Sequence, residues 1–155
     1  MTTITLTLPY PISANRYWRT FMPKGFKAPV TTLSSEAKAY KEQVGWLCKA
    51  AGIRKPLQGR VAVAYVLYPH RPLDYAKRMA KDPLCWDDTV QCIDLDNAQK
   101  VLFDSLKNIA FEDDKFIRRI HAERAEPDGQ ARVVVTITAL VVESPQPALF
   151  EALPA

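Results

Sequence analysis

The sequence predicts an α+β fold in which two helices pack on a mixed four-stranded sheet, in the order β-α-β-(insert)-α-β-β. Three patterns predict it. Hydrophobic residues alternate with threonines over residues 3–8, as in a half-buried strand. Residues 60–68 are apolar on both faces, which is typical of a central strand. Residues 98–109 carry apolar side chains at helical spacing, so one face of that helix is expected to be buried.

A first helix is expected before the central strand. Ser34 or Ser35 can cap its start, and Gly52 can end it after Ala51. The apolar side chains between these limits follow helical spacing. The second helix is expected to begin after Asp96 and to end near Ala110.

The last two strands are predicted from a turn motif, and two irregular segments are predicted from the lack of a regular hydrophobic period. Residues 116–124 and 132–142 are interpreted as the last two strands, and Pro127-Asp128-Gly129 between them is typical of a hairpin turn. Residues 12–32 are interpreted as a long irregular loop. No single period holds over residues 69–92, so we interpret them as an insertion that includes a short helical turn.

Length and composition indicate one globular domain. The chain has 155 residues, of which 48% are hydrophobic and 25% charged. We assign residues 1–143 to this domain and residues 144–155, which hold three prolines, to a flexible tail. No apolar run approaches the roughly 20 residues that span a membrane, and no signal peptide opens the chain. We therefore expect a cytoplasmic protein without a membrane partner.

The three cysteines, Cys48, Cys85 and Cys92, show no CxxC spacing. An odd number without that spacing argues against a disulfide framework and against a structural zinc site. Reduced, packed thiols are expected.

Charge is unevenly distributed along the chain. Residues 1–60 hold ten basic and two acidic side chains, whereas residues 94–128 hold six basic and nine acidic ones. A basic half beside an acidic cluster suits a protein that binds a polyanion and cuts it with a metal. The alternative is a solvated surface of uneven charge.

The acidic cluster is centred on Asp94 and Asp96, two residues apart at the expected helix start. Hard cations such as Mg²⁺ prefer carboxylate oxygens, and Asp113 or Asp114 can supply a third acid where the chain returns. Lys100 lies one helical turn past Asp96, where it can stabilise charge on a phosphate under attack. Such a set favours metal-assisted phosphodiester hydrolysis. The alternative is that Asp96 only caps the helix.

Several motifs occur together in this chain. Asp94 to Lys100 reads DLDNAQK, Phe103 to Leu106 reads FDSL, Leu8 to Arg19 reads LPYPISANRYWR, and Ser34 to Lys41 reads SSEAKAYK. In this order, and with an Asp-Asp pair downstream, they resemble the motifs of the RusA family of Holliday junction resolvases. The resemblance covers residues 4–142.

The resemblance implies a homodimeric crossover junction endodeoxyribonuclease that nicks four-way DNA junctions symmetrically, in recombination and repair. It implies Mg²⁺ as cofactor, for which Mn²⁺ can substitute, held by Asp94, Asp96 and Asp114, with Asp114 preferred to Asp113. Lys100 matches the family's catalytic lysine. The family is typical of bacteria and of bacteriophage genomes. The insertion is longer than in compact members, so it is either a DNA-contacting lobe or a lid, and it leaves substrate preference open.

Basic and aromatic side chains indicate DNA contacts, because cations neutralise phosphates and aromatic rings stack on bases. The expected DNA-binding residues are Asn15, Arg16, Tyr17, Arg19, Lys24, Lys27, Lys77 and Arg78. The alternative is that Tyr17 and Trp18 belong to the core and that the arginines are only solvated.

The tail contains a second candidate contact. Gln146, Leu149 and Phe150 resemble a QxxLF-type peptide that binds the bacterial sliding clamp. For the whole protein three other functions stay open: a broader endonuclease for branched or flapped DNA, a non-catalytic junction-binding module, and a phosphohydrolase of small nucleotides.

Overall fold

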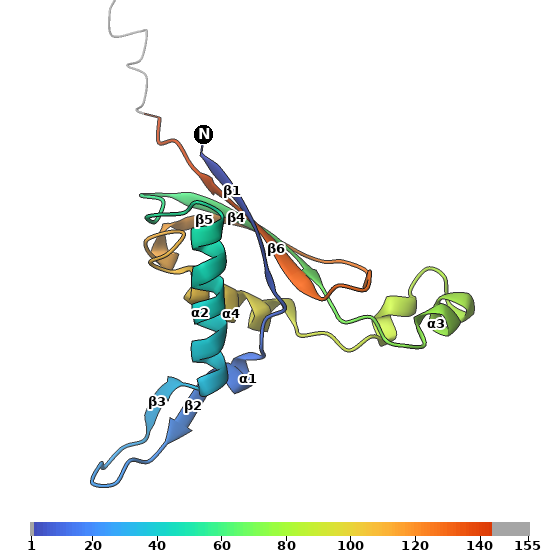
Figure 1. The fold of residues 1–155 in the computed structure, drawn as a ribbon, viewed down its shortest axis with the longest axis horizontal. Coiled ribbons are helices and arrows are strands. Elements are labelled where there is room, and N and C mark those ends of the chain that lie inside the picture. The colour runs from blue at the N-terminus through green and yellow to red at the C-terminus, as the bar shows by residue number, and fades with distance from the viewer. Residues whose placement is uncertain (1, 144–155) are drawn as a thin grey trace, which may run out of the picture.

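The computed structural model describes residues 2–143, and its main feature is a mixed four-stranded sheet (Figure 1). Its strands are β1 (Thr3–Pro9), β4 (Val61–Tyr68), β5 (Ile117–Arg124) and β6 (Arg132–Ala139). They lie in the order β1-β6-β4-β5, with β4 parallel to β5 and antiparallel to β6. The predicted α+β class and the mixed four-stranded sheet are confirmed.

One face of this sheet carries the core. Along β4 the odd-numbered residues from Val61 to Leu67 are buried, whereas those between them are half-buried. The two long helices, α2 (Ser35–Ala50) and α4 (Leu95–Leu106), pack on the sheet and contact each other. Each fully buried valine, leucine or phenylalanine contributes about 1.5–3 kcal/mol. The core therefore holds α4, and with it the acidic segment at the start of α4, in a fixed place.

Helix α2 begins as the sequence predicts. The Ser34 hydroxyl oxygen accepts the N–H of Ala37 at 3.1 Å, which satisfies one free donor of the first turn. Gly52, just after the helix, has a φ of +88°, a conformation that favours glycine.

The predicted hairpin of the last two strands is wrong. The turn at 127–129 links β5 to β6, but β4 lies between them in the sheet. The central place goes to the strand that can bury side chains on both faces, which is the apolar β4. β5, with the sequence IRRIHAER, is charged and suits an edge. The turn chemistry is local, whereas the pairing is decided by burial across the whole sheet.

The segment predicted to be an irregular loop is instead ordered. It contains a short helix, α1 (Ala14–Tyr17), and then a two-stranded hairpin of β2 (Trp18–Phe21) and β3 (Val30–Leu33). Figure 1 shows this hairpin projecting from the body beside the start of α2. Cross-strand bonding such as that between the hydroxyls of Thr20 and Thr31, 2.9 Å apart, supports it.

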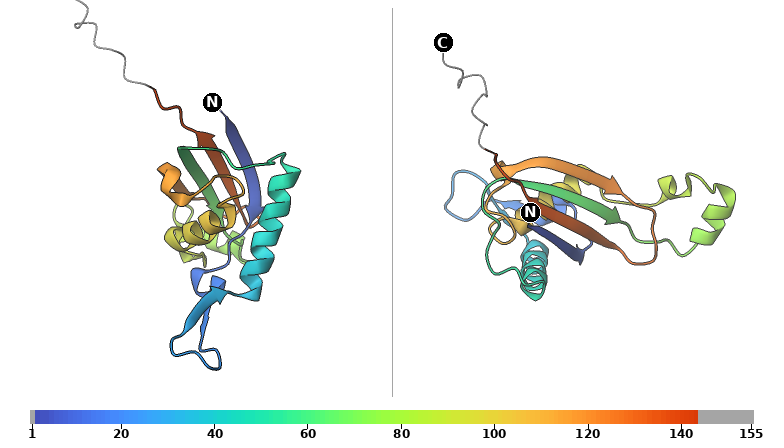
Figure 2. Two further views of the ribbon diagram at one scale, coloured as in Figure 1. Left: turned by 90° about the vertical axis from the view of Figure 1, so that its left-hand side faces the viewer. Right: turned by 90° about the horizontal axis from the view of Figure 1, so that it is seen from above.

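Residues 69–92 form a second projection, which we call the arm (Figures 1 and 2). It contains α3 (Tyr75–Lys81) and the 3-10 helix η1 (Trp86–Thr89), in agreement with the predicted helical turn. The Trp86 indole is buried and its N–H donates to the Glu126 carboxylate. The Arg124 guanidinium donates to two carbonyl oxygens at the end of the arm, those of Asp87 (2.8 Å) and Val90 (3.1 Å). The arm is thus bound to the body near β5.

Within residues 2–143 no helix is both long and apolar enough to span a membrane. The predicted clamp-binding residues, Gln146, Leu149 and Phe150, lie outside the described residues.

Candidate active site

The acidic segment sits at the open start of α4. Asp94 occupies the N-cap position with an extended backbone, and Asp96 lies in the first turn. Neither side chain forms a capping hydrogen bond, and both are exposed. The alternative in which Asp96 serves as the cap is therefore not what the structure shows. Both carboxylates keep their oxygens available to a ligand.

Two tyrosine hydroxyls hold the backbone on either side of Asp94. The Tyr10 hydroxyl accepts the N–H of Ile93 at 2.8 Å. The Tyr65 hydroxyl, reaching up from β4, donates to the carbonyl of Leu95 at 3.0 Å and lies 3.1 Å from the Gln99 side-chain oxygen. Burial raises the pKa of Tyr10 to about 12 and also raises the pKa of Tyr65, which the charge of Asp96 raises further. Both hydroxyls therefore stay protonated at neutral pH.

The downstream acids differ from each other in their partners. The Asp113 carboxylate accepts the N–H of Lys115 at 3.1 Å and lies 3.7 Å from the Lys107 ammonium. These contacts, the backbone hydrogen bond first, lower the pKa of Asp113. Asp114 opens the 3-10 helix η2 (Asp114–Phe116), is exposed, and has no hydrogen-bonded or ion-paired side-chain partner among residues 2–143. The two neighbouring carboxylates thus differ in their contacts, and the choice of Asp114 over Asp113 stays a prediction.

Lys100 is exposed on α4 and, within the described part of the chain, forms no ion pair. Its position one turn past Asp96 on the same helix is as the sequence predicts. Its ammonium group is free to contact an added phosphate.

The acids do not form a preassembled metal cage. Among residues 2–143 no group of three or more His, Cys, Asp and Glu side chains lies close enough together to hold a metal ion. The structure therefore does not bring Asp94, Asp96 and Asp114 together on one ion. Mg²⁺, however, is commonly held by one or two carboxylates together with waters and substrate phosphate oxygens. The donor chemistry of Asp94 and Asp96 fits that kind of site, and it does not fit a site built from protein ligands alone.

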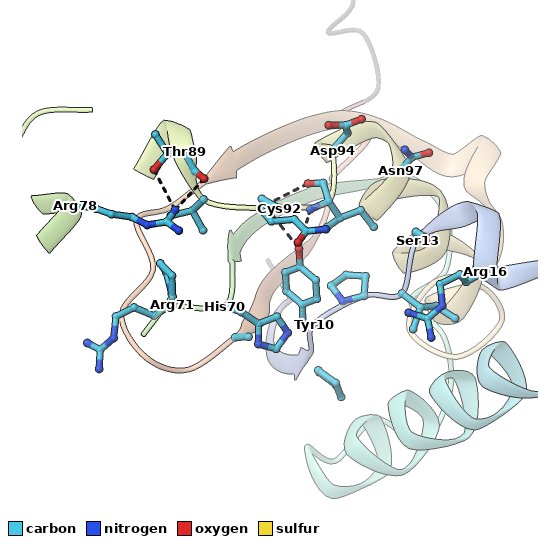
Figure 3. Close-up of a pocket in the computed structure, with 18 residues that line it drawn as sticks. Tyr10, Ser13, Arg16, His70, Arg71, Arg78, Thr89, Cys92, Asp94 and Asn97 are labelled. Atoms are coloured by element: carbon cyan, nitrogen blue, oxygen red, sulfur yellow. Dashed lines mark hydrogen bonds between the residues drawn. The ribbon is translucent and has the colours of Figure 1, made fainter. Parts of the chain in front are cut away.

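A large groove, of about 1090 Å³, runs from this helix start to the arm (Figure 3). Its charged and polar lining combines Tyr10, Ser13, Arg16, His70, Arg71, Arg78, Thr89, Gln91, Asp94 and Asn97. Figure 3 shows Arg71 and Arg78 toward one end, the His70 and Tyr10 rings in the middle, and Arg16 with Asn97 toward the other end. Asp94 stands on the rim. The groove therefore joins an acidic helix start to arginine side chains from two separate segments, α1 and the arm.

Only some of the expected DNA-binding residues line this groove. Arg16 and Arg78 do, each beside an acid: Arg16 lies 2.7 Å from the Glu36 carboxylate, and Arg78 lies 2.9 Å from that of Asp74. Arg78 also donates to the carbonyl of Thr89 at 3.0 Å. Both guanidiniums are thus oriented by neighbours.

The other expected contacts lie elsewhere. Arg19 is exposed on β2, Lys24 and Lys27 are exposed in the loop of the β2–β3 hairpin, Asn15 is exposed on α1, and Lys77 is exposed on α3. None of these five is among the residues that line the groove. Four of them, all except Asn15, are cations on the two projections, the β2–β3 hairpin and the arm.

Tyr17 belongs to the core. Its side chain is 0% exposed, and its hydroxyl donates to the Asp104 carboxylate on α4. The Trp18 ring packs edge-on against it at a centroid distance of 4.5 Å. The structure therefore places Tyr17 in the packing between α1 and α4 and not on a DNA-facing surface, in agreement with the alternative left open by the sequence.

Sequence reasoning missed Tyr10, Tyr65, His70 and Arg71. Tyr10 lies inside the quoted LPYP stretch, and His70 and Arg71 lie between the prolines at the start of the predicted insertion, so each carried a local signal. Nothing local in the β4 pattern indicates that the Tyr65 hydroxyl ends beneath the start of α4, thirty residues later.

This α+β domain places an acidic helix start on the rim of an arginine-lined groove. Such a site is typical of proteins that bind and hydrolyse a phosphodiester. The family described as Endodeoxyribonuclease RusA matches residues 9–138, so the chain belongs to the RusA endodeoxyribonuclease family. One similar protein is a curated "Crossover junction endodeoxyribonuclease RusA" from Escherichia coli O139:H28 (strain E24377A / ETEC). It is 29% identical over 145 residues, which cover 90% of this chain and 98% of that protein. The family resemblance found in the motifs is confirmed.

Proposed function

We propose that the protein is a Mg²⁺-dependent endonuclease that resolves four-way DNA junctions by paired symmetric nicks, in recombination and repair. The observation that carries the proposal is the DLDN-x-x-K segment, Asp94 to Lys100, held open at a helix start on the rim of a cationic groove. Membership of the RusA endodeoxyribonuclease family and the printed name of the Escherichia coli relative support it.

Asp94 and Asp96 are the residues that would hold the metal, Mg²⁺ or in its place Mn²⁺. Asp114, which does not share a preformed cage with them, would join them once DNA and the ion are bound. When bound, the ion would polarise the phosphate and activate a water. Lys100 stabilises the negative charge that grows on the phosphate oxygens as the bond breaks. The two tyrosine hydroxyls fix the backbone that carries the first two acids.

Cationic side chains would hold the DNA around this centre. Arg16 and Arg78 contact phosphates in the groove, and Arg19, Lys24, Lys27, Lys77 and Asn15 contact them on the periphery. A four-way junction offers two symmetric strands, and a C2 homodimer places one centre on each.

We further propose that Gln146, Leu149 and Phe150 bind the bacterial sliding clamp. Their replacement by alanine should abolish clamp pull-down and leave cutting of short synthetic junctions unchanged.

Two alternatives remain as outcomes of the test. The first is a broader endonuclease for branched or flapped DNA, and the second is a non-catalytic junction-binding module. A groove of this size, together with two cationic projections, exceeds what a small nucleotide needs.

One assay separates these functions. A synthetic four-way junction, a flap, a linear duplex and a nucleoside triphosphate are incubated with the protein, with and without Mg²⁺. Paired symmetric nicks in the junction alone support the proposal, and equal cutting of flap and junction supports the broader nuclease. Binding without cleavage at any Mg²⁺ or Mn²⁺ concentration refutes catalysis. Light scattering that shows only monomer, with and without DNA, refutes the dimer.

A further inference from the structure

We infer that one strand of the DNA lies in the groove between the arm and the body, with Arg71 on a phosphate and the exposed His70 ring facing a base. This inference rests on the proposed function and deepens it, because it assigns the arm a defined part of the substrate. Neither Arg71 nor His70 was expected as a contact from the sequence.

The arm is positioned as a wall of the groove and is bound to the body through its C-terminal part. The chain leaves the groove floor after β4, makes α3 and η1, and returns through Thr89 to Ile93 into Asp94. Trp86 is only 2% exposed, and together with Glu126 and Arg124 it fixes this return to β5. Whatever the arm contacts is therefore held at a set place relative to the acids.

The three arginines that line the groove differ in whether they form an ion pair within the protein. Arg16 and Arg78 each pair with a carboxylate, whereas Arg71 has no ion pair among residues 2–143. Its guanidinium lies 4.0 Å from the centroid of the Tyr75 ring, and this stacking orients it without using its N–H groups. Arg71 is thus a cation that an added phosphate can contact without displacing an acid.

The middle of the groove is aromatic. The His70 and Tyr10 rings lie 4.9 Å apart between centroids, tilted by 57°, and His70 is exposed. Figure 3 shows this pair between the arginines of the arm and Arg16. Cations flanking an aromatic platform are the arrangement that binds the backbone and bases of a single strand. A duplex would instead present its bases stacked inside.

The native cysteines report on this groove directly. Cys92 is half-buried and lines the groove, Cys85 is exposed on the arm but is not among the lining residues, and Cys48 is buried in the core. The experiment measures N-ethylmaleimide labelling of each cysteine by peptide mass spectrometry, with and without saturating four-way junction. EDTA is present so that the DNA stays whole. We expect the junction to slow labelling of Cys92 at least about tenfold, and to leave that of Cys85 within about twofold.

A pair of variants tests the phosphate contact independently. Arg71→Ala should weaken junction binding several-fold and reduce the slope of log affinity against log salt by about one. Lys55→Ala removes another exposed cation, which lines a different pocket near the end of α2, and should change neither quantity.

The outcomes separate the inference from the proposed function. If the wild type cuts junctions while Cys92 labels at the same rate with and without DNA, the strand does not occupy the groove and the inference fails alone. The same follows if Arg71→Ala binds like Lys55→Ala. If the wild type neither binds nor cuts any junction, the proposed function is refuted, and the inference that rests on it is refuted as well.

Discussion

Acidic residues lie both at the start of α4 and in the turn after it, but their carboxylates make different contacts. At the start of α4, Asp94 and Asp96 are exposed and form no capping bond, while the backbone on either side of Asp94 is fixed by Tyr10 and Tyr65. In the turn that follows, the carboxylate of Asp113 is itself the structural element, because it accepts a backbone N–H and pairs with Lys107. From this difference in contacts we expect Asp94 and Asp96 to bind a ligand and Asp113 to stabilise the fold.

The largest effect is expected at the helix start. Asp96→Asn should lower junction cutting by about a thousandfold or more, because a neutral amide is a poor ligand for a hard cation. Junction binding in EDTA should persist, since the groove is untouched. Cutting rates are measured on gels and binding by fluorescence anisotropy. Cutting at the wild-type rate would remove Asp96 from the site.

The adjacent pair in the turn sharpens the comparison. Asp114→Asn should reduce cutting by about a hundredfold, whereas Asp113→Asn should stay within about twofold of wild type. The two variants remove the same charge from neighbouring positions, so net electrostatics cannot explain a difference. If Asp113→Asn is instead the inactive variant, the assignment of roles in this turn is reversed.

The sequence predicts the framework of this site because its signals are local. Alternation along β1, the apolar run of β4 and the helical period of α4 each lie within a few residues, so the elements and the position of Asp94 follow directly. Pairing is not local. The position of β4 between β5 and β6 depends on which strand can bury both faces, and no turn at 127–129 encodes that.

The groove could not be predicted for the same reason. It requires Trp86 on the arm to meet Glu126 after β5, forty residues later, and Tyr10 to meet Ile93, over eighty residues later. The β2–β3 hairpin was missed because its strands are only four residues long, and because the WRTF sequence of β2 carries basic and aromatic side chains that also suit a loop. Local sequence patterns therefore predict the positions of the acids, whereas the residues that surround them are known only from the structure.

A moderate effect is expected from the support beneath the helix start. Tyr65→Phe removes the hydroxyl that reaches the Leu95 carbonyl, at a stability cost of about 1 kcal/mol. We expect kcat to fall about tenfold with KM unchanged, because the acids lose alignment while the groove keeps its cations. Tyr17→Phe is the matched control, since it removes the same atom from another buried tyrosine, one that contacts Asp104 farther along α4.

A comparable loss of stability in both variants, with a loss of kcat only in Tyr65→Phe, supports a positioning role. Equal kcat in the two variants would mean that Tyr65 merely stabilises the fold. Unfolding is followed by denaturant titration and cutting by initial rates on a synthetic junction.

The smallest expected effect is on the pH dependence of folding stability, and it concerns Asp113 in the turn after α4. The pKa of Asp113 is lowered in the folded protein, so its contribution to stability is present above the unfolded value of about 3.9 and is lost as pH falls through the lower folded pKa. Asp113→Asn should therefore be slightly less stable than wild type at pH 7, and this difference should vanish in acid. Asp114→Asn is the matched control, because it removes a neighbouring carboxylate and leaves Asp113 with its contacts to Lys115 and Lys107. Thermal unfolding of both variants and of the wild type is measured at pH values from 7 to about 2. A stability difference for Asp113→Asn that persists unchanged into acid would show that its role comes from packing and not from charge.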